Sequence, residues 1–456
     1  MKWTKKKKRL KPRKHDTKRM MKRFFFLLVI AIAGKEAIAQ QDSLTVEEAV
    51  AYSLRNNYDI QLSRQDSAVA AINYLYRNAG FYPRLNGSGT YLSNNNNQRQ
   101  TLADGSEKER KGIRSNSLTA SVNLNWTVFD GFRMFLLRNQ LDIAVEQGNL
   151  VVKSAAINTV ANVITTYYDI VRQQQQLRNV EEQMQLASDR LKLAQYKFDI
   201  GVGIKPDVLQ ARIDFNNSKA AQLNQLALID QRRQTLNQLM NTAPSVNYKV
   251  SDTIPVRSDL VLANLLSNPS TPDLQLSRAN IKAAELNVRL TKAQRYPTVS
   301  LISAYNFSRT SNNQVINQFS PLFNLNKGFN YGITATVPIL NNFTVRQQIR
   351  QSELAVKFQQ LQYENQTSLL NTNVVNSYRS YEAQRQVVET LDSSVGLARE
   401  NLFIERERYR LGKTTFIELR QAEENVSTTI TNLINARYNL KVAETELLRL
   451  RGDLVR

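Results

Sequence analysis

A repeating pattern of apolar residues that ends in a glycine-rich segment constrains the fold of this chain more than any other feature. Its members are spaced alternately by three and four positions: Leu177, Val180, Met184, Ala187, Leu191, Ala194 and Phe198. This spacing is typical of a coiled coil. Gly201, Gly203 and Pro206 then oppose a regular helix, and a second helical pattern begins at Asp207. The stretch therefore predicts a helical hairpin with a tight tip.

The same hairpin is encoded a second time, at a constant offset of 211 residues. Gly412 corresponds to Gly201, and Glu418 corresponds to Asp207. The apolar positions correspond as well, with Glu405 as a polar exception: Val388, Leu391, Val395, Ala398, Leu402 and Tyr409. The sequence therefore predicts an internal duplication. Because both hairpins keep identical spacing, we expect their tips to reach one plane.

Cysteine and histidine usage limits the chemistry that the chain can perform. Its 456 residues include no cysteine and one histidine, His15. Disulfides, thiol catalysis and Cys/His metal sites are therefore excluded, and so is histidine acid–base catalysis if His15 lies in a removed segment. We expect a protein that is not an enzyme and that uses no cofactor and no metal ion.

The start of the chain has the pattern of a secretory signal peptide. A basic pair at residues 22–23 precedes an apolar run at residues 24–33, and two alanines lie just before a cut site ahead of Gln40. An apolar run of this length is too short to span a bilayer as a helix. We therefore expect residues 1–39 to be removed as a signal peptide.

The basic residues at the start also dominate the overall charge. Residues 1–23 hold 13 of the 61 lysines and arginines and one acid, Asp16, in a chain of formal net charge +22. A nucleic-acid-binding arm is one interpretation of this run, but processing before Gln40 would remove it, so we expect no nucleic-acid partner. The run is longer than a signal peptide needs, which favours a translation start at Met20 or Met21.

Several stretches alternate between apolar and polar residues with the period of a β-strand. In the clearest one, residues 118–128, Leu, Ala, Val and Trp alternate with Thr, Ser and Asn. Further strands are predicted at residues 84–93, 299–307 and 329–339, with exposed loops at 94–116 and 309–327. Alternation over about 10 residues suits a membrane β-barrel with one face toward lipid and the other toward an aqueous lumen. A strand of a soluble sandwich is the alternative.

Helical patterns occupy most of the remaining chain. Thr45 and Glu48 form a capping-box pattern at the start of the first helix, and Asn56-Asn57 interrupts it. The helix predicted over residues 133–199 would be on the order of 100 Å long, so it needs a coiled-coil partner. The last helix has the most regular spacing of all: Leu419, Ala422, Val426, Thr429, Leu433, Ala436, Leu440, Ala443, Leu447 and Leu450.

These elements divide the chain into two copies of one unit. Each copy holds helices, two strands and a long helical hairpin. The predicted boundaries are 1–39 for the signal peptide, 40–241 for the first repeat, 242–259 for a connector and 260–456 for the second repeat.

The four strands cannot form a closed barrel within one chain. A barrel needs at least about eight strands, and an open sheet would leave unpaired edges in lipid. We therefore expect the chain to oligomerise, and three copies would supply twelve strands. The signal peptide takes the chain out of the cytoplasm, and the mature part has no apolar run of about 18 residues. The expected fold is a mixed α+β membrane protein, a transmembrane barrel in the outer membrane continued by a coiled-coil α-helical barrel.

The residues from about 40 to the end resemble the TolC-like outer-membrane efflux protein family. The motifs that carry the resemblance are LTVEEAV, two Tyr-Pro pairs, FDGF, LNNF, KFDIGVGIKPDVLQA, RYRLGKTTFIELRQA and ARYNLKVAETELL. The resemblance implies a homotrimer with one continuous channel that extends from the outer membrane into the periplasm. It also implies outer-membrane lipid, a periplasmic adaptor and an inner-membrane pump of RND or ABC type as partners. The function would be an exit duct for tripartite efflux or type I secretion.

The resemblance also carries roles to the hairpin tips. A family tyrosine three residues before the second-tip glycine corresponds to Tyr409, and an acid at the constriction corresponds to Glu418, with Asp207 as its first-tip counterpart. Thr414 stands where the best-known members have an arginine that links tip helices in the closed gate, and Gln421 stands where they have a second acid. The segments that would contact the adaptor are Ile200, Gly201, Val202, Leu411, Gly412 and Lys413.

Simpler roles are open for each of these residues. The glycines could serve only the turns, the acids could act only on the helix dipole, and Tyr409 could be a packing residue. For the whole chain, the alternative function is a structural periplasmic coiled-coil or adaptor protein. Alternating strands with an aromatic-tipped apolar face argue against an adaptor, which would carry small soluble β-domains.

Overall fold

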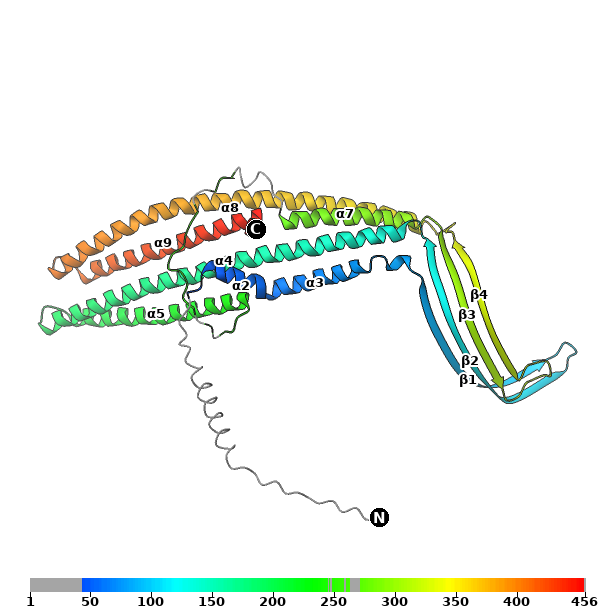
Figure 1. Ribbon diagram of the computed structural model, residues 1–456. Helices are drawn as coiled ribbons and strands as arrows, with labels where there is room; N and C mark the ends of the chain where they lie inside the picture. Colours follow the sequence, from blue (N-terminus) through cyan, green and yellow to red (C-terminus); the bar gives the residue numbers. More distant parts are fainter. Residues whose placement is uncertain (1–42, 245, 247, 258–259, 263–270, 455–456) are drawn as a thin grey trace, which may run out of the picture.

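The computed structural model describes residues 43–244, 246, 248–257, 260–262 and 271–454. The molecule is elongated, with long helices at one end and a curved sheet at the other (Figure 1). The predicted signal peptide and positions 245, 247, 258 and 259 of the predicted connector lie outside the described residues.

Two helical hairpins of equal length dominate the helical part. Each pairs a helix of 67 residues with one of 36 residues. The first hairpin consists of α4 (Arg133–Asp199) and α5 (Lys205–Met240), and the second of α8 (Thr344–Arg410) and α9 (Phe416–Arg451). The equal spacing in the two sequence copies therefore appears as equal helix lengths, and both tips lie at the same end of the molecule (Figure 1).

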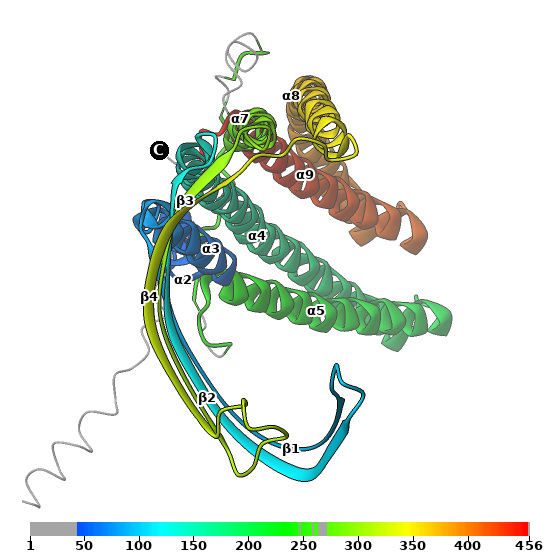
Figure 2. The ribbon, with the colours of Figure 1, turned by 90° about the vertical axis from the view of Figure 1, so that its right-hand side faces the viewer.

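Shorter helices complete each half of the helical part. They are α2 (Val46–Asn56), α3 (Tyr58–Leu75), the 3-10 turn η1 (Ala79–Phe81) and α7 (Pro272–Ala293). Contacts place α4 between α3 and α7 on the sheet side and between α5 and α9 on the tip side, whereas α8 packs against α7 and α9. The helices thus form a curved layer with α5 and α8 at its edges (Figure 2). Within the part of the chain that is described, none of the helices is long and apolar enough to cross a membrane.

The predicted capping box at the first helix is confirmed. The Glu48 backbone N–H donates to the Thr45 hydroxyl at 3.2 Å, and the Thr45 N–H donates to the Glu48 carboxylate at 2.9 Å. The regular spacing predicted for the last helix is confirmed as well. Of its ten positions, all except the half-buried Thr429 are buried.

Both passages from strand to long helix have the same backbone geometry. The residue before α4 is Phe132, with φ 66°, and the residue before α8 is Phe343, with φ 60°. Gly131 also has a positive φ, and a Cβ there would lie 2.7 Å from the Ala293 carbonyl oxygen, so glycine is required at this position. FDGF and LNNF therefore build equivalent junctions.

The four strands form one antiparallel sheet in the order β1-β2-β3-β4, with β1 and β4 at the edges. Their bounds are Arg84–Thr101 for β1, Glu107–Phe129 for β2, Thr298–Asn312 for β3 and Phe323–Thr336 for β4. The sheet curves into an arc (Figure 2). This arc has the shape of a segment of a barrel wall.

The register gives the sheet one apolar and one polar face. Val122 pairs with Tyr305 and Tyr305 pairs with Phe329, so apolar residues of three strands share one face. On the other face, Ser121 pairs with Asn306. Large apolar side chains on the first face are exposed, such as Tyr331 at 83%. This two-faced pattern is the one predicted for a lipid-facing barrel strand.

The predicted loops at 94–116 and 309–327 are wrong in their extent. β1 continues through Asn94–Asn97 to Thr101, and β2 already begins at Glu107, so the connecting turn covers residues 102–106. On the other hairpin, β3 extends to Asn312 and β4 begins at Phe323. The strands continue because ladder hydrogen bonds do not require alternation, and a strand in water on both sides can be polar on both faces.

Candidate functional site

The two hairpin tips are built on the same backbone hydrogen bonds. In the first tip, the N–H groups of Ile200, Gly201 and Val202 donate to the carbonyls of residues 196, 198 and 197. In the second tip, the N–H groups of residues 411, 412 and 413 donate to the carbonyls of residues 407, 409 and 408. Each donor and acceptor in the first tip has its counterpart 211 residues later in the second tip. The two sequence copies therefore form the same individual hydrogen bonds.

The glycines at the tips serve the turn itself. Gly201 has φ 78° and Gly412 has φ 72°, and no atom lies within 4 Å of a Cβ built at either position. The left-handed conformation explains glycine at both sites, because an L side chain rarely adopts it. The neighbouring side chains are exposed, at 53% for Ile200, 72% for Val202 and 63% for Leu411. The predicted adaptor segments are thus rigid turns that present apolar side chains to solvent.

The tips differ at the residue two positions after this glycine. Gly203 donates from its N–H to the Lys197 carbonyl at 2.8 Å, and a Cβ there would lie 2.8 Å from the Phe198 backbone nitrogen. Its counterpart is Thr414, whose hydroxyl donates to Glu405 at 3.0 Å and to Glu418 at 2.5 Å. The first tip is therefore closed by close backbone contact and the second by side-chain hydrogen bonds.

Glu418 is the acceptor of a capping box at the start of α9. It accepts from the Thr415 N–H at 2.7 Å and from the hydroxyls of Thr414 and Thr415. Hydrogen bonds from Thr414 and Thr415 lower the pKa of the exposed Glu418 carboxyl to about 2. The carboxylate is therefore a fixed negative charge at the tip, and part of its role is to cap the helix.

Tyr409 is a buried packing residue between the two hairpins. It belongs to a cluster with Ala194, Val208, Phe416 and Leu419. The Lys197 ammonium lies 3.9 Å from its ring centroid, and the same group donates to the Tyr409 carbonyl at 3.3 Å. Burial, together with the nearby Asp207 charge, raises the pKa of the Tyr409 hydroxyl. The simpler packing role set out for this residue is the one that the geometry supports.

The two other predicted gate residues do not meet Glu418 within one chain. Asp207 is half-buried in the first turn of α5, and its N–H donates to the Ile204 carbonyl at 3.2 Å. Gln421 is exposed and donates to Asn425 at 3.0 Å, one turn further along α9. Lys413 is exposed as well. Within the described chain, Asp207 therefore lies at the first tip and Glu418 at the second, and Tyr409 packs between the two hairpins near Asp207.

Sequence reasoning missed a buried ionic cluster just above the tips. Arg190 of α4 is buried and forms ion pairs with Asp214 of α5, at 2.9 Å, and with Glu423 of α9. Arg420 lies 3.5 Å from the same Asp214 carboxylate, and the Arg190 guanidinium lies 5.2 Å from the Phe416 ring centroid. Burial raises the pKa of Glu423, and the Arg190 charge opposes this rise. The cluster joins three helices of the two hairpins.

The sequence contained one signal for this cluster, which is that its charged residues are not repeated in the other copy. At the offset of 211, Arg190 corresponds to Asn401 and Asp214 corresponds to Asn425. Glu423 corresponds to the oppositely charged Arg212. A charged set in one copy that is replaced in the other indicates an interface present in only one of the two places.

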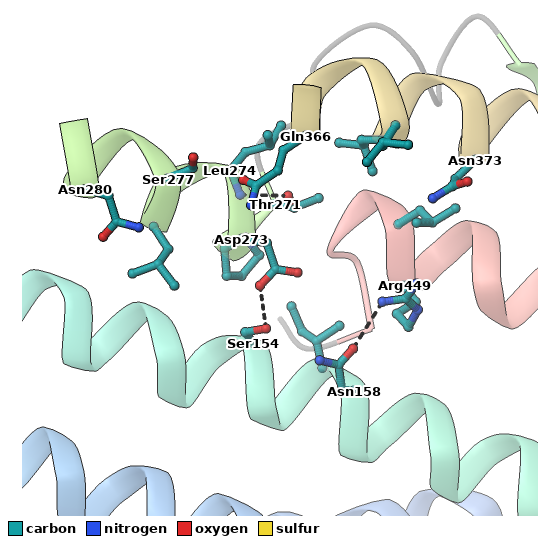
Figure 3. A pocket seen from close by; sticks show the side chains of 16 residues that line it. Ser154, Asn158, Thr271, Asp273, Leu274, Ser277, Asn280, Gln366, Asn373 and Arg449 are labelled. Carbon is teal, nitrogen blue, oxygen red and sulfur yellow. Dashed lines mark hydrogen bonds between the residues drawn. The ribbon is translucent and has the colours of Figure 1, made fainter. Parts of the chain in front are cut away.

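A pocket of about 360 Å³ lies in the middle of the molecule, between α4, α7, α8 and α9 (Figure 3). Ser154 donates to Asp273 at 2.6 Å, and Arg449 donates to Asn158 at 3.1 Å. Arg449 also forms an ion pair with Glu446 at 2.7 Å. The charged groups at this pocket are therefore engaged with protein partners. Among the residues that the structure describes, no group of three or more His, Asp or Glu is placed to hold a metal ion.

Comparison with known proteins identifies the family. The family described as "Outer membrane efflux protein" matches residues 50–242 and again residues 265–453. Toxin and drug export protein A of Aggregatibacter actinomycetemcomitans is 24% identical over 72% of this chain and 71% of its own length. TolC of Escherichia coli strain K12 is 20% identical over 95% of this chain and 87% of its own length.

Solved structures show the same fold. The CmeC outer membrane channel of Campylobacter jejuni superimposes with a TM-score of 0.75 at 15% sequence identity, covering 90% of this chain and 85% of that chain. The TolC-like resemblance inferred from the sequence is thereby confirmed. The chain belongs to the outer membrane efflux protein family, and it is a channel protein of the outer membrane that extends into the periplasm.

Proposed function

We propose that three copies of this chain form one continuous exit duct. The observation that carries the proposal is a curved, two-faced sheet whose edge strands β1 and β4 both lack a partner in the described chain. Three such sheets would close a twelve-stranded barrel and remove every free edge. The polar faces would then line an aqueous lumen, and the apolar faces would contact lipid.

The helical layer supports the same assembly. Buried residues occur along most of α4, whereas α8 contributes only five: Ile349, Ser352, Val374, Tyr381 and Tyr409. α5 and α8 lie at the edges of the layer, and both expose large apolar side chains, such as Leu223 and Phe358. In a ring of three chains, α5 of one copy would pack against α8 and α9 of the next. The helices would then form a tube that continues the barrel.

The tips are the proposed docking end of this tube. Ile200, Gly201 and Val202 in the first tip, and Leu411, Gly412 and Lys413 in the second, would contact a periplasmic adaptor. Exposed apolar side chains on fixed turns suit such a contact, because little entropy is lost when they are covered. An inner-membrane pump of RND or ABC type would deliver the cargo, and the duct itself would perform no catalysis.

The lower opening of the tube is proposed to carry an acidic ring. Three Glu418 and three Asp207 would face the constriction in the trimer, with Tyr409 packed behind them. Thr414 and Gln421 stand where an arginine and an acid occur in related channels, so the closed state would lack one ionic link. We expect Thr414→Arg to lower the conductance of the purified protein in a planar bilayer. Equal conductance of the two proteins would refute this role of Thr414.

The cargo is proposed to be small molecules, proteins or both. The name of one relative, Toxin and drug export protein A, states that it exports toxins and drugs. The polar face of the sheet is rich in Ser, Thr and Asn, which suits a wide and non-adhesive lumen. Selection among cargoes would then lie in the pump.

In-cell crosslinking tests the docking proposal directly. Photoreactive residues would be introduced at 200–204 and 411–415, and, as a matched control, at exposed positions of α5 far from the tip. We expect crosslinks to an adaptor from the two tips only. Crosslinks from the control positions alone, or recovery of the protein with soluble periplasm, would contradict the proposal and favour a structural periplasmic protein.

A further inference from the structure

Charged residues are few, and all are basic, in the part of the sheet that lies between the helices and the outer β1–β2 segment at residues 97–112. Across residues 84–96, 113–129, 298–312 and 323–336, the charged residues are Arg84, Arg114, Arg309 and Lys327. All of them are basic. Three of the four lie in the half of the sheet that is distant from the helices, so this region carries a net positive charge.

Arg309 and Lys327 lie on the apolar face of the sheet. Arg309 pairs with Leu118 of β2 and with Leu325 of β4, and Lys327 pairs with Phe307 of β3. The Arg309 guanidinium lies 5.5 Å from the Phe323 ring centroid, and the Lys327 ammonium lies 5.8 Å from the Phe307 ring centroid. Both cations are therefore held beside aromatic rings on the face proposed to contact lipid.

Neither cation has a carboxylate partner in the described chain. Every ion pair with a nitrogen–oxygen distance of up to 4.0 Å that involves a strand residue lies in the outer β1–β2 hairpin, namely Arg99–Glu107 and Lys111–Glu109. Arg309 and Lys327 are both exposed. Residues in the same rows on the polar face are neutral, such as Ser308 and Asn326. The charges of Arg309 and Lys327 thus lie on the apolar face, and the described part of one chain places no carboxylate within ion-pair distance of either.

The position of the two cations along the strands matches the edge of a membrane. From Val299, beside the helical junction, to Arg309 the strand rises about 33 Å. A tilt of about 40° reduces this to about 25 Å along the barrel axis, which is the height of the apolar band of an outer-membrane barrel. Arg309 therefore lies at the outer boundary of the band, where lipid headgroups begin.

Basic side chains are tolerated at this depth, but they require anions. Arg or Lys on the lipid face is unfavourable at the midplane of the bilayer and is tolerated near the interface. Because the described part of the chain offers Arg309 and Lys327 no carboxylate, an anion of the membrane is the counter-charge that suits this position. Phosphate groups are anions that lie at the level of lipid headgroups, and arginine binds phosphate in a bidentate geometry.

We propose that Arg309 and Lys327 form a binding site for the phosphorylated headgroup of an outer-leaflet glycolipid of the lipid A type. Arg114 extends this site, since it lies on the same alternating series of β2 as Leu118, on the outer side of the Arg309 row. Its backbone is fixed by Asn313, whose side chain accepts from the Arg114 N–H at 2.7 Å. The inference rests on the proposed orientation of the sheet in the membrane.

Native mass spectrometry of the full detergent-extracted protein tests the site. The protein would be titrated with bis-phosphorylated lipid A, with dephosphorylated lipid A and with inorganic phosphate. The test variant is Arg309→Gln with Lys327→Gln. The matched control is Arg84→Gln, which removes a positive charge from the other face of the sheet, and Arg309→Lys with Lys327→Arg retains both charges.

We expect bis-phosphorylated lipid A to bind the wild-type protein at least about tenfold more tightly than the double Gln variant. The Arg84→Gln and charge-retaining variants should bind as the wild type does. Equal affinity for the dephosphorylated lipid, displacement by millimolar inorganic phosphate, or unchanged binding by the double Gln variant would overturn the site. If the double Gln variant still conducts normally in a bilayer, any of these three outcomes would overturn the lipid site alone and leave the proposed channel function standing. A wild-type protein that does not insert into bilayers would overturn both.

Discussion

The two helical hairpins have the same backbone but are held in place differently. Their helices have equal lengths, and their turns share three hydrogen bonds. The first hairpin packs on both sides of α4 and contains Arg190 of the buried ionic cluster, whereas the second has α8 at an edge and a side-chain cap at its tip. The two copies therefore share the backbone geometry of the tip. They differ in the side-chain contacts that hold each hairpin, which are buried ion pairs in the first and a helix cap in the second.

The ionic cluster provides the strongest test of this difference. We expect Arg190→Ala to destabilise the protein by about 3–5 kcal/mol, because it leaves the buried Glu423 without its ion pair and Asp214 with only the longer contact to Arg420. Asn401→Ala, at the corresponding position of the second hairpin, should have a much smaller effect. Thermal unfolding followed by circular dichroism measures both. Similar losses in the two variants would show that the hairpins are held alike.

The next largest difference between the two tips is expected at the residue that closes each turn, Gly203 in the first and Thr414 in the second. A side chain at position 203 meets backbone atoms, so Gly203→Ala should cost about 1–3 kcal/mol. Thr414→Ala at the matching position removes hydrogen bonds to the half-buried Glu405 and the exposed Glu418 and should cost about 0.5–1.5 kcal/mol. Proteolysis at each tip compares the two variants. Faster cleavage of the second tip than of the first would reverse the expected order.

Helix capping is expected to cause a smaller difference in stability between α5 and α9, the second helices of the two hairpins. Thr415→Ala should destabilise the start of α9 by about 1 kcal/mol. Ile204, the equivalent residue before α5, makes no side-chain cap, so Ile204→Thr should stabilise that helix by a similar amount. Amide hydrogen exchange in the first turns of α5 and α9 reports both changes. No change in exchange in either variant would contradict the capping assignment.

The pH response of the second tip is the smallest expected effect. Hydrogen bonds lower the pKa of Glu418 from 4.5 to about 2. The folded tip thus binds the proton more weakly than the unfolded chain does, so the stabilisation is fully present above pH 4.5 and is lost as the pH falls toward about 2. The protection of the amides in the first turn of α9, corrected for the pH dependence of intrinsic exchange, should fall as the pH is lowered through this range in the wild type and not in Glu418→Gln. A wild-type profile that is flat over this range would refute the cap.

The features that could be predicted from the sequence are those that produce a local pattern of apolar, polar or glycine residues. Alternation at residues 118–128 predicted the two faces of the sheet, and the glycines at 201 and 412 predicted the turns. The strand extensions around Asn94–Asn97 could not be predicted, since ladder hydrogen bonds involve the backbone and leave no side-chain pattern outside the membrane. The pairing of Arg190 with Glu423 spans two helices that are distant in sequence, so only their packing reveals it.

The role of Glu418 shows a different limit. Its position was predicted from the family resemblance, but its contacts come from Thr414 and Thr415, which the resemblance did not assign as helix-capping partners. Thr415 and Glu418 match the capping-box pattern that Thr45 and Glu48 display, so the local sequence already contained this signal. The residue proposed for the gate, Glu418, is therefore also a helix cap, and a substitution there would remove the cap whatever it does to the gate.

The central claim is that the unit of function is a conducting trimer. The most direct measurement counts the chains in each conducting unit, by photobleaching of singly labelled, detergent-extracted protein in a planar bilayer while current is recorded. We predict three bleaching steps at each spot whose insertion produces a step in the recorded current. One step per conducting site, or protein that inserts and carries no current, would contradict the account.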